Sequence, residues 1–114
     1  MQIIKYLKLP FLFDAGLLQQ EVNALSASQW LPHYQVKHYE GTWTAIPLRS
    51  IGGKADDVII SPADNPQYLD TIFLESCPYL QKVLQTFQCP LQAVRLLKLN
   101  AGSSIKEHRD AELN

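Results

Sequence analysis

Hydrophobic positions recur along this chain with two different periods, and the helical period appears in two segments. Leu17, Leu18, Val22 and Leu25 share one face of a helix that Asp14 can cap at its N-terminus. Leu80, Val83, Leu84 and Phe87 form a second stripe of the same kind. Ser76 is the expected cap of this second helix, because Pro78 then falls in the first turn, where proline is tolerated.

The remaining apolar segments alternate with the period of a strand. Residues 2–9, 42–48 and 91–100 are the expected strands, and residues 58–60 form a shorter candidate. In the segment 42–48 we expect Trp43, Ala45 and Leu48 to face inward. In the segment 91–100, one face carries Ala93, Arg95, Leu97 and Leu99, and the other carries Val94, Leu96 and Lys98. A turn at Gly102 follows, and residues 105–110 begin another extended segment.

These elements predict an α+β fold, with helices packed on a partial, mostly antiparallel sheet. We expect residues 1–114 to form a single domain. The hydrophobic content of 46% and charged content of 18% are typical of a soluble globular protein. A net charge of −1 gives no electrostatic reason to expect nucleic-acid or membrane binding. The absence of a signal-peptide pattern and of a disulfide framework predicts a cytoplasmic protein with reduced cysteines.

The chemistry-bearing pattern lies at the end of the sequence, in His108-Arg109-Asp110. Residues two apart on an extended strand point to the same side, so His108 and Asp110 can offer an imidazole and a carboxylate to one metal ion. Iron(II) oxygenases use two histidines and one carboxylate in this way. The spacing alone is common, and an exposed chain end is the plain alternative. No histidine follows, because the chain ends at Asn114.

The residues around this pair strengthen the iron interpretation. The segment from Arg95 through Gly102 to Asp110 resembles the iron-binding segment of the aspartyl/asparaginyl β-hydroxylase family, in which the histidine also follows the turn glycine by six residues. Three upstream segments are similar to the region that precedes the catalytic core in that family: 30–34, 39–43 and 46–53. The resemblance covers nearly the whole chain, as the N-terminal portion of such an oxygenase.

The resemblance implies a double-stranded β-helix, a jelly-roll or cupin-like fold, of which this chain would hold the start. It implies Fe(II) as the metal, with His108 and Asp110 as two ligands, and 2-oxoglutarate as the co-substrate. The family's third ligand, a distal histidine, and its 2-oxoglutarate-binding arginine have no counterpart among these residues. We therefore expect a domain truncated after its first metal-ligand motif and inactive by itself.

Two residues are weaker candidates for the same site. Arg95 could bind a carboxylate of the co-substrate, since a guanidinium grips carboxylates in a bidentate manner; a surface ion pair is the competing interpretation. Trp43 could line a substrate pocket, although packing in the core explains a tryptophan equally well. His33 and His38 are expected to be partly buried structural histidines.

We therefore expect a 2-oxoglutarate-dependent dioxygenase that hydroxylates an amino-acid or peptide substrate. The substrate would be an Asp or Asn side chain, or a free amino acid such as proline. A binding module that dimerises through its exposed sheet edge is the alternative from another class. A cupin-like metal-binding protein without oxygenase chemistry is the third. A downstream histidine followed by an arginine would favour the enzyme.

Overall fold

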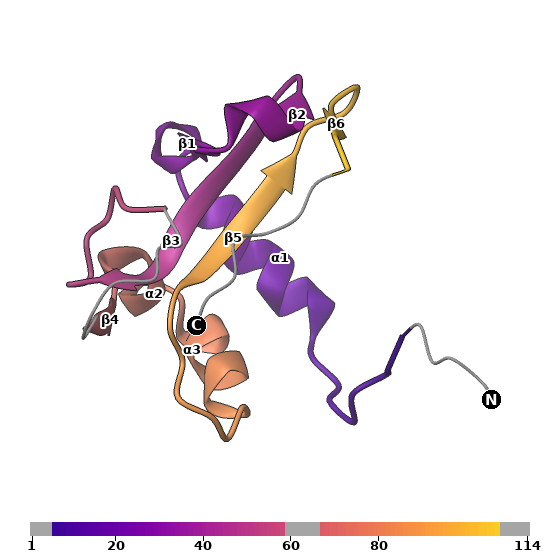
Figure 1. Cartoon of the computed structure of the whole chain (residues 1–114). Coiled ribbons are helices and arrows are strands. Elements are labelled where there is room, and N and C mark those ends of the chain that lie inside the picture. Colours follow the sequence, from indigo (N-terminus) through magenta and orange to yellow (C-terminus); the bar gives the residue numbers. More distant parts are fainter. Residues whose placement is uncertain (1–5, 59–66, 108–114) are drawn as a thin grey trace.

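The computed structural model describes residues 6–58 and 67–107 (Figure 1). Within these ranges three α-helices and six strands follow one another, with short 3₁₀ helices at Ala27–Gln29 and Val36–His38. In chain order the main elements are α1 (Ala15–Ala24), β1 (Leu31–Pro32), β2 (Tyr39–Glu40), β3 (Trp43–Ile51), β4 (Tyr68–Asp70), α2 (Ile72–Glu75), α3 (Pro78–Gln85), β5 (Val94–Leu99) and β6 (Ser104–Ile105).

Strand β3 is the centre of the larger sheet. Its neighbour along one edge is β5, and the other edge pairs with β1 at Ala45 and with β4 at Arg49. Strands β2 and β6 form a separate two-stranded sheet at the end of β3 and β5 (Figure 1). Every one of these pairings is antiparallel. The predicted α+β fold with an antiparallel sheet is therefore confirmed, and both sheets are open.

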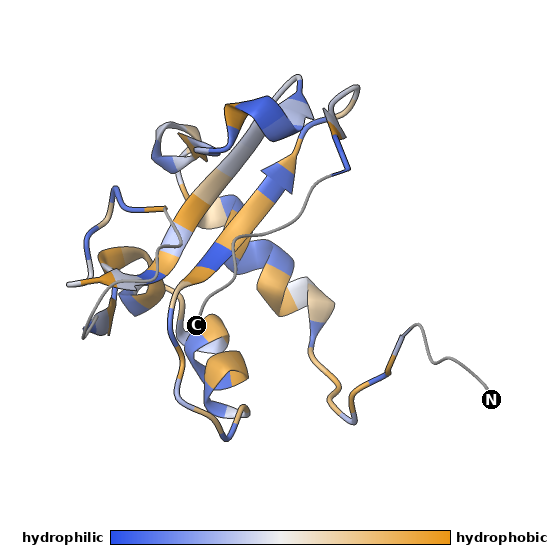
Figure 2. Ribbon diagram, in the orientation of Figure 1, coloured by the Kyte–Doolittle hydropathy of each residue, from blue (hydrophilic) through white to orange (hydrophobic). Residues whose placement is uncertain are grey.

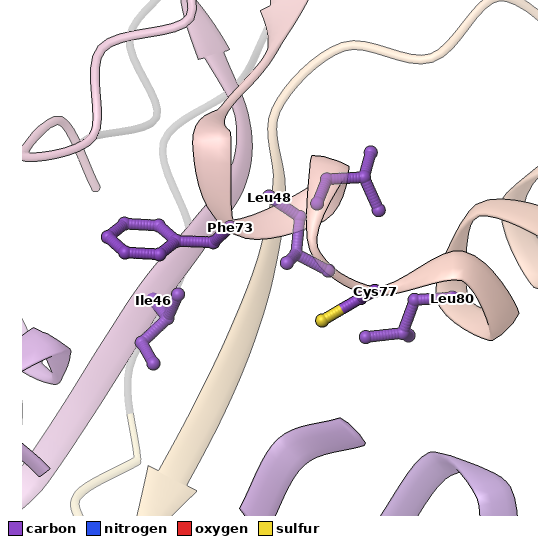
Figure 3. Close-up of a cluster of buried hydrophobic side chains, with 6 residues drawn as sticks. Ile46, Leu48, Phe73, Cys77 and Leu80 are labelled. Carbon is purple, nitrogen blue, oxygen red and sulfur yellow. The ribbon is translucent and has the colours of Figure 1, made fainter. Parts of the chain in front are cut away.

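The core lies between one face of β3 and the helices. Ile46 and Leu48 project from the strand toward α2 and α3, which contribute the remaining members of the cluster (Figure 3). Those members are Phe73, Leu74, Cys77 and Leu80. Val94 and Leu96 of β5 pack against the same cluster, as one of the two predicted faces of that strand. Helix α1 adds Leu18, and Leu25 just beyond its end also packs on the cluster.

The first helix begins as predicted, at the Asp14 cap. An Asp14 carboxylate oxygen accepts a hydrogen bond from the backbone N–H of Leu17 at 3.1 Å. This bond satisfies one of the N–H groups that a helix start leaves without a partner.

The second predicted cap is wrong, and a residue distant in sequence replaces it. The Ser76 hydroxyl donates to the carbonyl of Phe73 at 2.8 Å, because Ser76 ends α2, a short helix that the sequence pattern did not reveal. Cys77 is the N-cap of α3 and makes no side-chain cap bond. Instead, the Glu21 carboxylate of α1 accepts hydrogen bonds from the backbone N–H groups of Tyr79 (2.7 Å) and Leu80 (2.8 Å). A carboxylate near the N-terminus of a helix also interacts favourably with the helix dipole.

The strand predictions need three corrections. Residues 6–9 form no strand, and Leu12, which follows them, is 99% exposed. Val58 is buried outside any strand, while the rest of the segment 58–60 lies outside the described residues. Trp43 and Ala45 do not share a face with Leu48, because Leu48 is five positions from Trp43 and three from Ala45, and odd spacings fall on opposite faces of an alternating strand. Both faces of β3 are covered, so all three side chains are nevertheless buried.

Strand β3 also contains a proline, which an interior strand normally excludes. Pro47 is accommodated by a bulge, since the register with β5 shifts between Pro47 and Arg49. The Pro47 carbonyl accepts a 2.7 Å hydrogen bond from the buried hydroxyl of Thr71, which precedes α2. The bulge therefore coincides with the place where α2 is tied to the sheet.

Candidate functional site

The face of the sheet turned away from the helical core carries the two weaker site candidates. On this face Trp43 is opposite Leu99, Ala45 is opposite Leu97, and Pro47 is opposite Arg95. Trp43 and Arg95 therefore share the face, about 13 Å apart along the strands at roughly 3.3 Å per residue. Leu97 and Leu99 are 49% and 43% exposed, so the β5 side of this face is open.

Trp43 belongs to an aromatic cluster at the end of the face. Its indole stacks on the His33 imidazole with 3.6 Å between ring centroids and 3° between planes. Tyr34 stacks on His33 with 4.9 Å between centroids, and Tyr39 meets both Trp43 and His33 edge-on. The cluster buries Trp43 to 8% exposure. Trp43 is thus both a packing residue and part of the wall of this face.

His33 is buried, and hydrogen bonds hold both its ring and its backbone. Its Nδ1 accepts the backbone N–H of Gln35 at 3.1 Å. The His33 carbonyl accepts the hydroxyl of Tyr39 at 3.1 Å. The β1–β3 pairing, extended by the His33 N–H to Trp43 carbonyl bond at 2.8 Å, holds the backbone beneath the stack.

Arg95 is half-buried on the same face. One terminal nitrogen of its guanidinium donates to the backbone carbonyl of Val58 at 3.2 Å. This contact explains in part how a charged side chain is tolerated beside Ala45 and Pro47. A guanidinium has five N–H donors in a planar fork, so it can serve several acceptors at once, a carboxylate among them.

The proposed metal ligands His108 and Asp110 lie outside the described residues. The described residues shortly before them belong to β6. Ile105 of β6 is opposite Tyr39 of β2, and the backbone N–H of Lys106 donates to the His38 carbonyl at 2.6 Å. Ile105 and Lys106 are therefore held beside Tyr39, which itself packs on Trp43.

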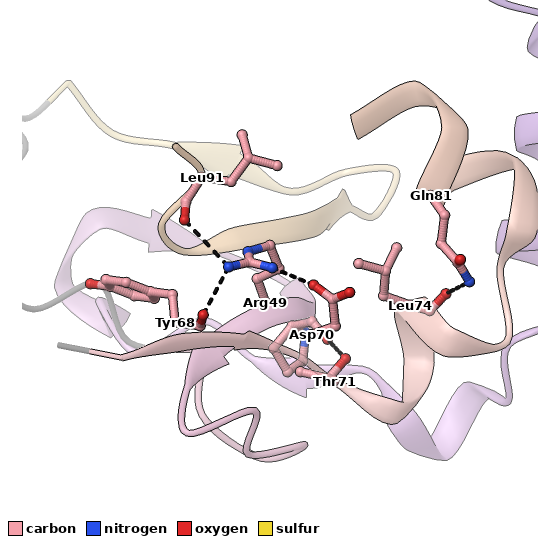
Figure 4. Close-up of polar contacts among 8 residues, drawn as sticks. Arg49, Tyr68, Asp70, Thr71, Leu74, Gln81 and Leu91 are labelled. Atoms are coloured by element: carbon pink, nitrogen blue, oxygen red, sulfur yellow. Dashed lines mark hydrogen bonds and ion pairs between the residues drawn. The ribbon is translucent and has the colours of Figure 1, made fainter. Parts of the chain in front are cut away.

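A second site, which the sequence interpretation did not single out, surrounds Arg49. Its guanidinium pairs with Asp70 of β4 and donates to the backbone carbonyls of Tyr68 (2.8 Å) and Leu91 (3.5 Å) (Figure 4). Its buried Nε has no hydrogen-bond partner among the described residues. An arginine inside the apolar run of β3 was the signal that could have marked it.

A hollow of about 200 Å³ adjoins Arg49. Helix α3 supplies one wall of the hollow through Gln81, and the exposed thiol of Cys89 lies in the connection to β5. Because the Arg49 guanidinium ties β4 and the connection that precedes β5 to β3, its evident role is to hold these three segments together. The second cysteine, Cys77, is different: burial raises the pKa of its thiol, and the nearby Glu21 carboxylate acts in the same direction.

Residues 6–58 and 67–107 contain no group of three histidine, cysteine or acidic side chains that could hold a metal ion. Within the same residues, no helix has the length and apolar character needed to cross a membrane. Comparison of the chain with protein-family models, with curated proteins and with solved structures gave no match.

Proposed function

We propose that this chain is the N-terminal part of a non-haem Fe(II)- and 2-oxoglutarate-dependent dioxygenase similar to the aspartyl/asparaginyl β-hydroxylases. Its substrate would be an Asp or Asn side chain of a peptide, or a free amino acid such as proline. His108 and Asp110 would hold the iron, and residues outside this sequence would supply the second histidine and the arginine that binds 2-oxoglutarate. The chain alone is expected to be inactive, and a cytoplasmic location remains our expectation.

One observation carries this proposal: segments that resemble the family, far apart in the sequence, meet in space. The segment 39–43 pairs with residues 99–105 through β2–β6 and through Trp43 opposite Leu99. A hydrogen bond also joins the turn between β2 and β3 to the turn between β5 and β6: the Thr42 N–H donates to the Ser103 hydroxyl at 2.7 Å. A shared site would require this proximity, whereas a chance similarity of separate segments would not.

The sheets are compatible with the jelly-roll part of the proposal. A double-stranded β-helix is built from antiparallel strands whose inner face lines the site. The face with Trp43, Arg95 and the exposed Leu97 would be this inner face, and the helices already cover the opposite one. Among the described residues, β5 pairs with β3 alone, which leaves its outer edge available for a further strand.

The donor types fit iron, because one imidazole and one carboxylate are two-thirds of the facial set that Fe(II) oxygenases use. Bound iron would supply oxygen activation, coupled to oxidation of 2-oxoglutarate. The chain's own residues would do the positioning. Arg95 would bind a carboxylate through its guanidinium fork, and Trp43 would exclude water from one end of the face.

The test is an anaerobic Fe(II) titration of this chain and of a version extended by the codons that follow Asn114. We expect tight iron binding and succinate release in the extended protein only, with both lost in His108→Ala and Asp110→Ala. Arg109→Ala is the matched control, because the extended segment that the sequence predicts would turn residue 109 away from both ligands. No iron binding in the extended protein would disprove the proposal.

A second function is supported by one feature, the open edge and face of β5. Leu97 and Leu99 are about half exposed on a strand whose outer edge has no partner among the described residues. Such an edge favours pairing with another strand. A non-catalytic module that forms a homodimer through β5 would explain it. Concentration-dependent dimerisation together with no iron binding in either protein would favour this alternative.

A further inference from the structure

A groove on the helix-covered side of the sheet holds features that the proposed iron site does not use. It lies between the second half of α1, which runs behind β3 and β5, and the strand β5 itself (Figure 1). Its volume is about 370 Å³, within the range of pockets that take small molecules. Val22, Leu25 and Trp30 form its apolar wall, and Asn23 and Lys98 contribute polar groups.

The sheet register places Lys98 beside this apolar wall. Pro32 of β1 is opposite Thr44 of β3, which is in turn opposite Lys98 of β5. Trp30 precedes Pro32 by two positions, so its side chain leaves the extended chain on the same side. The Lys98 Nζ lies 5.5 Å from the centroid of the Trp30 ring, where the π face of the indole attracts a cation. This contact holds the ammonium group at the groove.

No carboxylate of residues 6–58 and 67–107 neutralises this ammonium group, because the ion pairs of these residues do not involve Lys98. The acidic residue of α1, Glu21, is occupied elsewhere, since its two carboxylate oxygens accept the N–H groups at the start of α3. The described lining of the groove contains no acidic side chain. The groove therefore combines an apolar wall with a positive charge that lacks an acidic partner.

Asn23 adds hydrogen-bond donors to the same groove. Its side-chain oxygen accepts a hydrogen bond from the Gln19 Nε2 at 3.1 Å, which orients the Asn23 carboxamide. The Asn23 amide nitrogen has two N–H groups to donate, and no acceptor for them occurs among the described residues. An ammonium group and an amide nitrogen that line one groove are suited to a carboxylate, which accepts hydrogen bonds at both of its oxygens.

We propose that this groove binds a small organic acid, in which a carboxylate is joined to an apolar aliphatic or aromatic tail. The carboxylate pairs with Lys98 and Asn23, and the tail covers the apolar wall. This site is independent of the proposed iron chemistry, since Lys98 is on the opposite side of β5 from Arg95. For a ligand of about a dozen heavy atoms in an open groove, the expected dissociation constant is about 1 mM.

An NMR titration of the isotope-labelled chain with phenylbutyrate and with octanoate tests the proposal without metal. We expect saturable shifts of the Trp30 indole N–H and of the Lys98 backbone amide. The neutral phenylbutyramide has the same tail as phenylbutyrate but no charge, so it should bind about tenfold more weakly. Equal affinity for the acid and its amide would overturn the proposal. The lack of saturable shifts with either acid, at concentrations well above the expected dissociation constant, would overturn it too.

Substitution of Lys98 tests the charge directly. Lys98 is exposed, so Lys98→Met should keep the fold, weaken phenylbutyrate binding by about tenfold and leave phenylbutyramide binding nearly unchanged. Lys98→Arg should retain most of the affinity for the acid, because it keeps the cation. Lys54→Met is the matched control, since Lys54 is also exposed but does not line the groove. If Lys98→Met binds the acid as tightly as Lys54→Met does, the groove is not an organic-acid site.

Discussion

The two faces of β3 are both buried at the middle of the strand, but they are buried in different ways. On one face Ile46 and Leu48 lie under α2 and α3 in an apolar cluster (Figure 3). On the other face Trp43 is covered by stacked aromatic rings, while Leu97 and Leu99 on the neighbouring strand stay half exposed. The ribbon coloured by hydropathy shows orange hydrophobic bands on both β3 and β5, between pale bands on β3 and blue hydrophilic bands on β5 (Figure 2).

This difference indicates that one face of the sheet serves folding stability and the other serves binding. The face under the helices has its apolar surface removed from water within the described chain, so we expect truncations there to cost more folding free energy than truncations at the exposed positions of the other face. The other face keeps apolar side chains in solvent beside polar groups such as Arg95, a combination that is typical of binding surfaces. The predictions below test whether the two faces divide the work in this way.

The largest effect is expected from truncating the helix-covered face. Leu48 is 1% exposed, so Leu48→Ala should lower the free energy of unfolding by about 2–5 kcal/mol through lost burial and the cavity left behind. Urea denaturation followed by circular dichroism measures it. Leu99→Ala, on the other face of the sheet, is the matched control and should cost much less. Equal losses would mean that the two faces contribute alike.

The second-largest loss of stability is expected from the contact between Glu21 of α1 and the N-terminus of α3. Glu21→Ala removes the carboxylate that accepts the N–H groups of Tyr79 and Leu80, and we expect a loss of about 1–2 kcal/mol. Glu21→Gln should recover part of this loss, because an amide oxygen can still accept one bond. Gln20→Ala, an exposed change on the same helix, should be nearly neutral in the same denaturation experiment.

The buried thiol gives the helix-covered face a pH dependence. Because burial raises the pKa of Cys77, the folded protein keeps this proton at a pH where the unfolded thiol has lost it. The stabilisation is therefore complete below the ordinary thiol pKa of about 8.5 and is lost as the pH rises through the higher folded value. The difference in unfolding free energy between the wild type and Cys77→Ala should become smaller as the pH rises from neutral to alkaline. A constant difference would contradict this.

The same burial predicts different thiol reactivity in the native state. Cys89 is exposed and Cys77 is buried, so a thiol reagent at neutral pH should modify Cys89 first and Cys77 only on unfolding. Mass spectrometry after timed labelling distinguishes them, with Cys89→Ser as the control that should show almost no fast labelling. Fast modification of Cys77 in the folded Cys89→Ser protein would mean that the core opens readily.

Local sequence signals predicted the elements whose causes are local. The Asp14 cap, the alternation of β5 and the antiparallel α+β class follow from residues close together in the chain. The cap of α3 could not be found in this way, because Glu21 is 58 residues away from Tyr79. The segment 6–9 has strand-forming residues, yet it forms no strand, because none of the described strands pairs with it.

The features of the candidate site also differ in whether local sequence could reveal them. The His-x-Asp pattern was visible as a motif, and its own geometry lies outside the described residues. Two other contacts, the stack of His33 on Trp43 and the ion pair of Arg49 with Asp70, form only because strands distant in the sequence pair with each other. No residue spacing in the sequence indicates which strands pair. Gly41 is an intermediate case: it lies in the segment 39–43 that carries the resemblance, but only the fold shows that a Cβ there would lie 2.7 Å from the Ser103 Cβ.

The smallest effect on stability is expected on the open face. Leu97 is 49% exposed, so Leu97→Asp should change the unfolding free energy of the monomer by no more than about 0.5 kcal/mol. Its effect on association should be large if the open edge of β5 pairs with a second copy, because a charge would then be buried in the interface. Light scattering over a range of concentrations measures this, with Leu69→Asp as the control, since Leu69 is 51% exposed on β4, beyond the opposite edge of β3. A dimer that Leu97→Asp dissociates would support the module, and a monomer unaffected by either change would leave this face for the remainder of an oxygenase site.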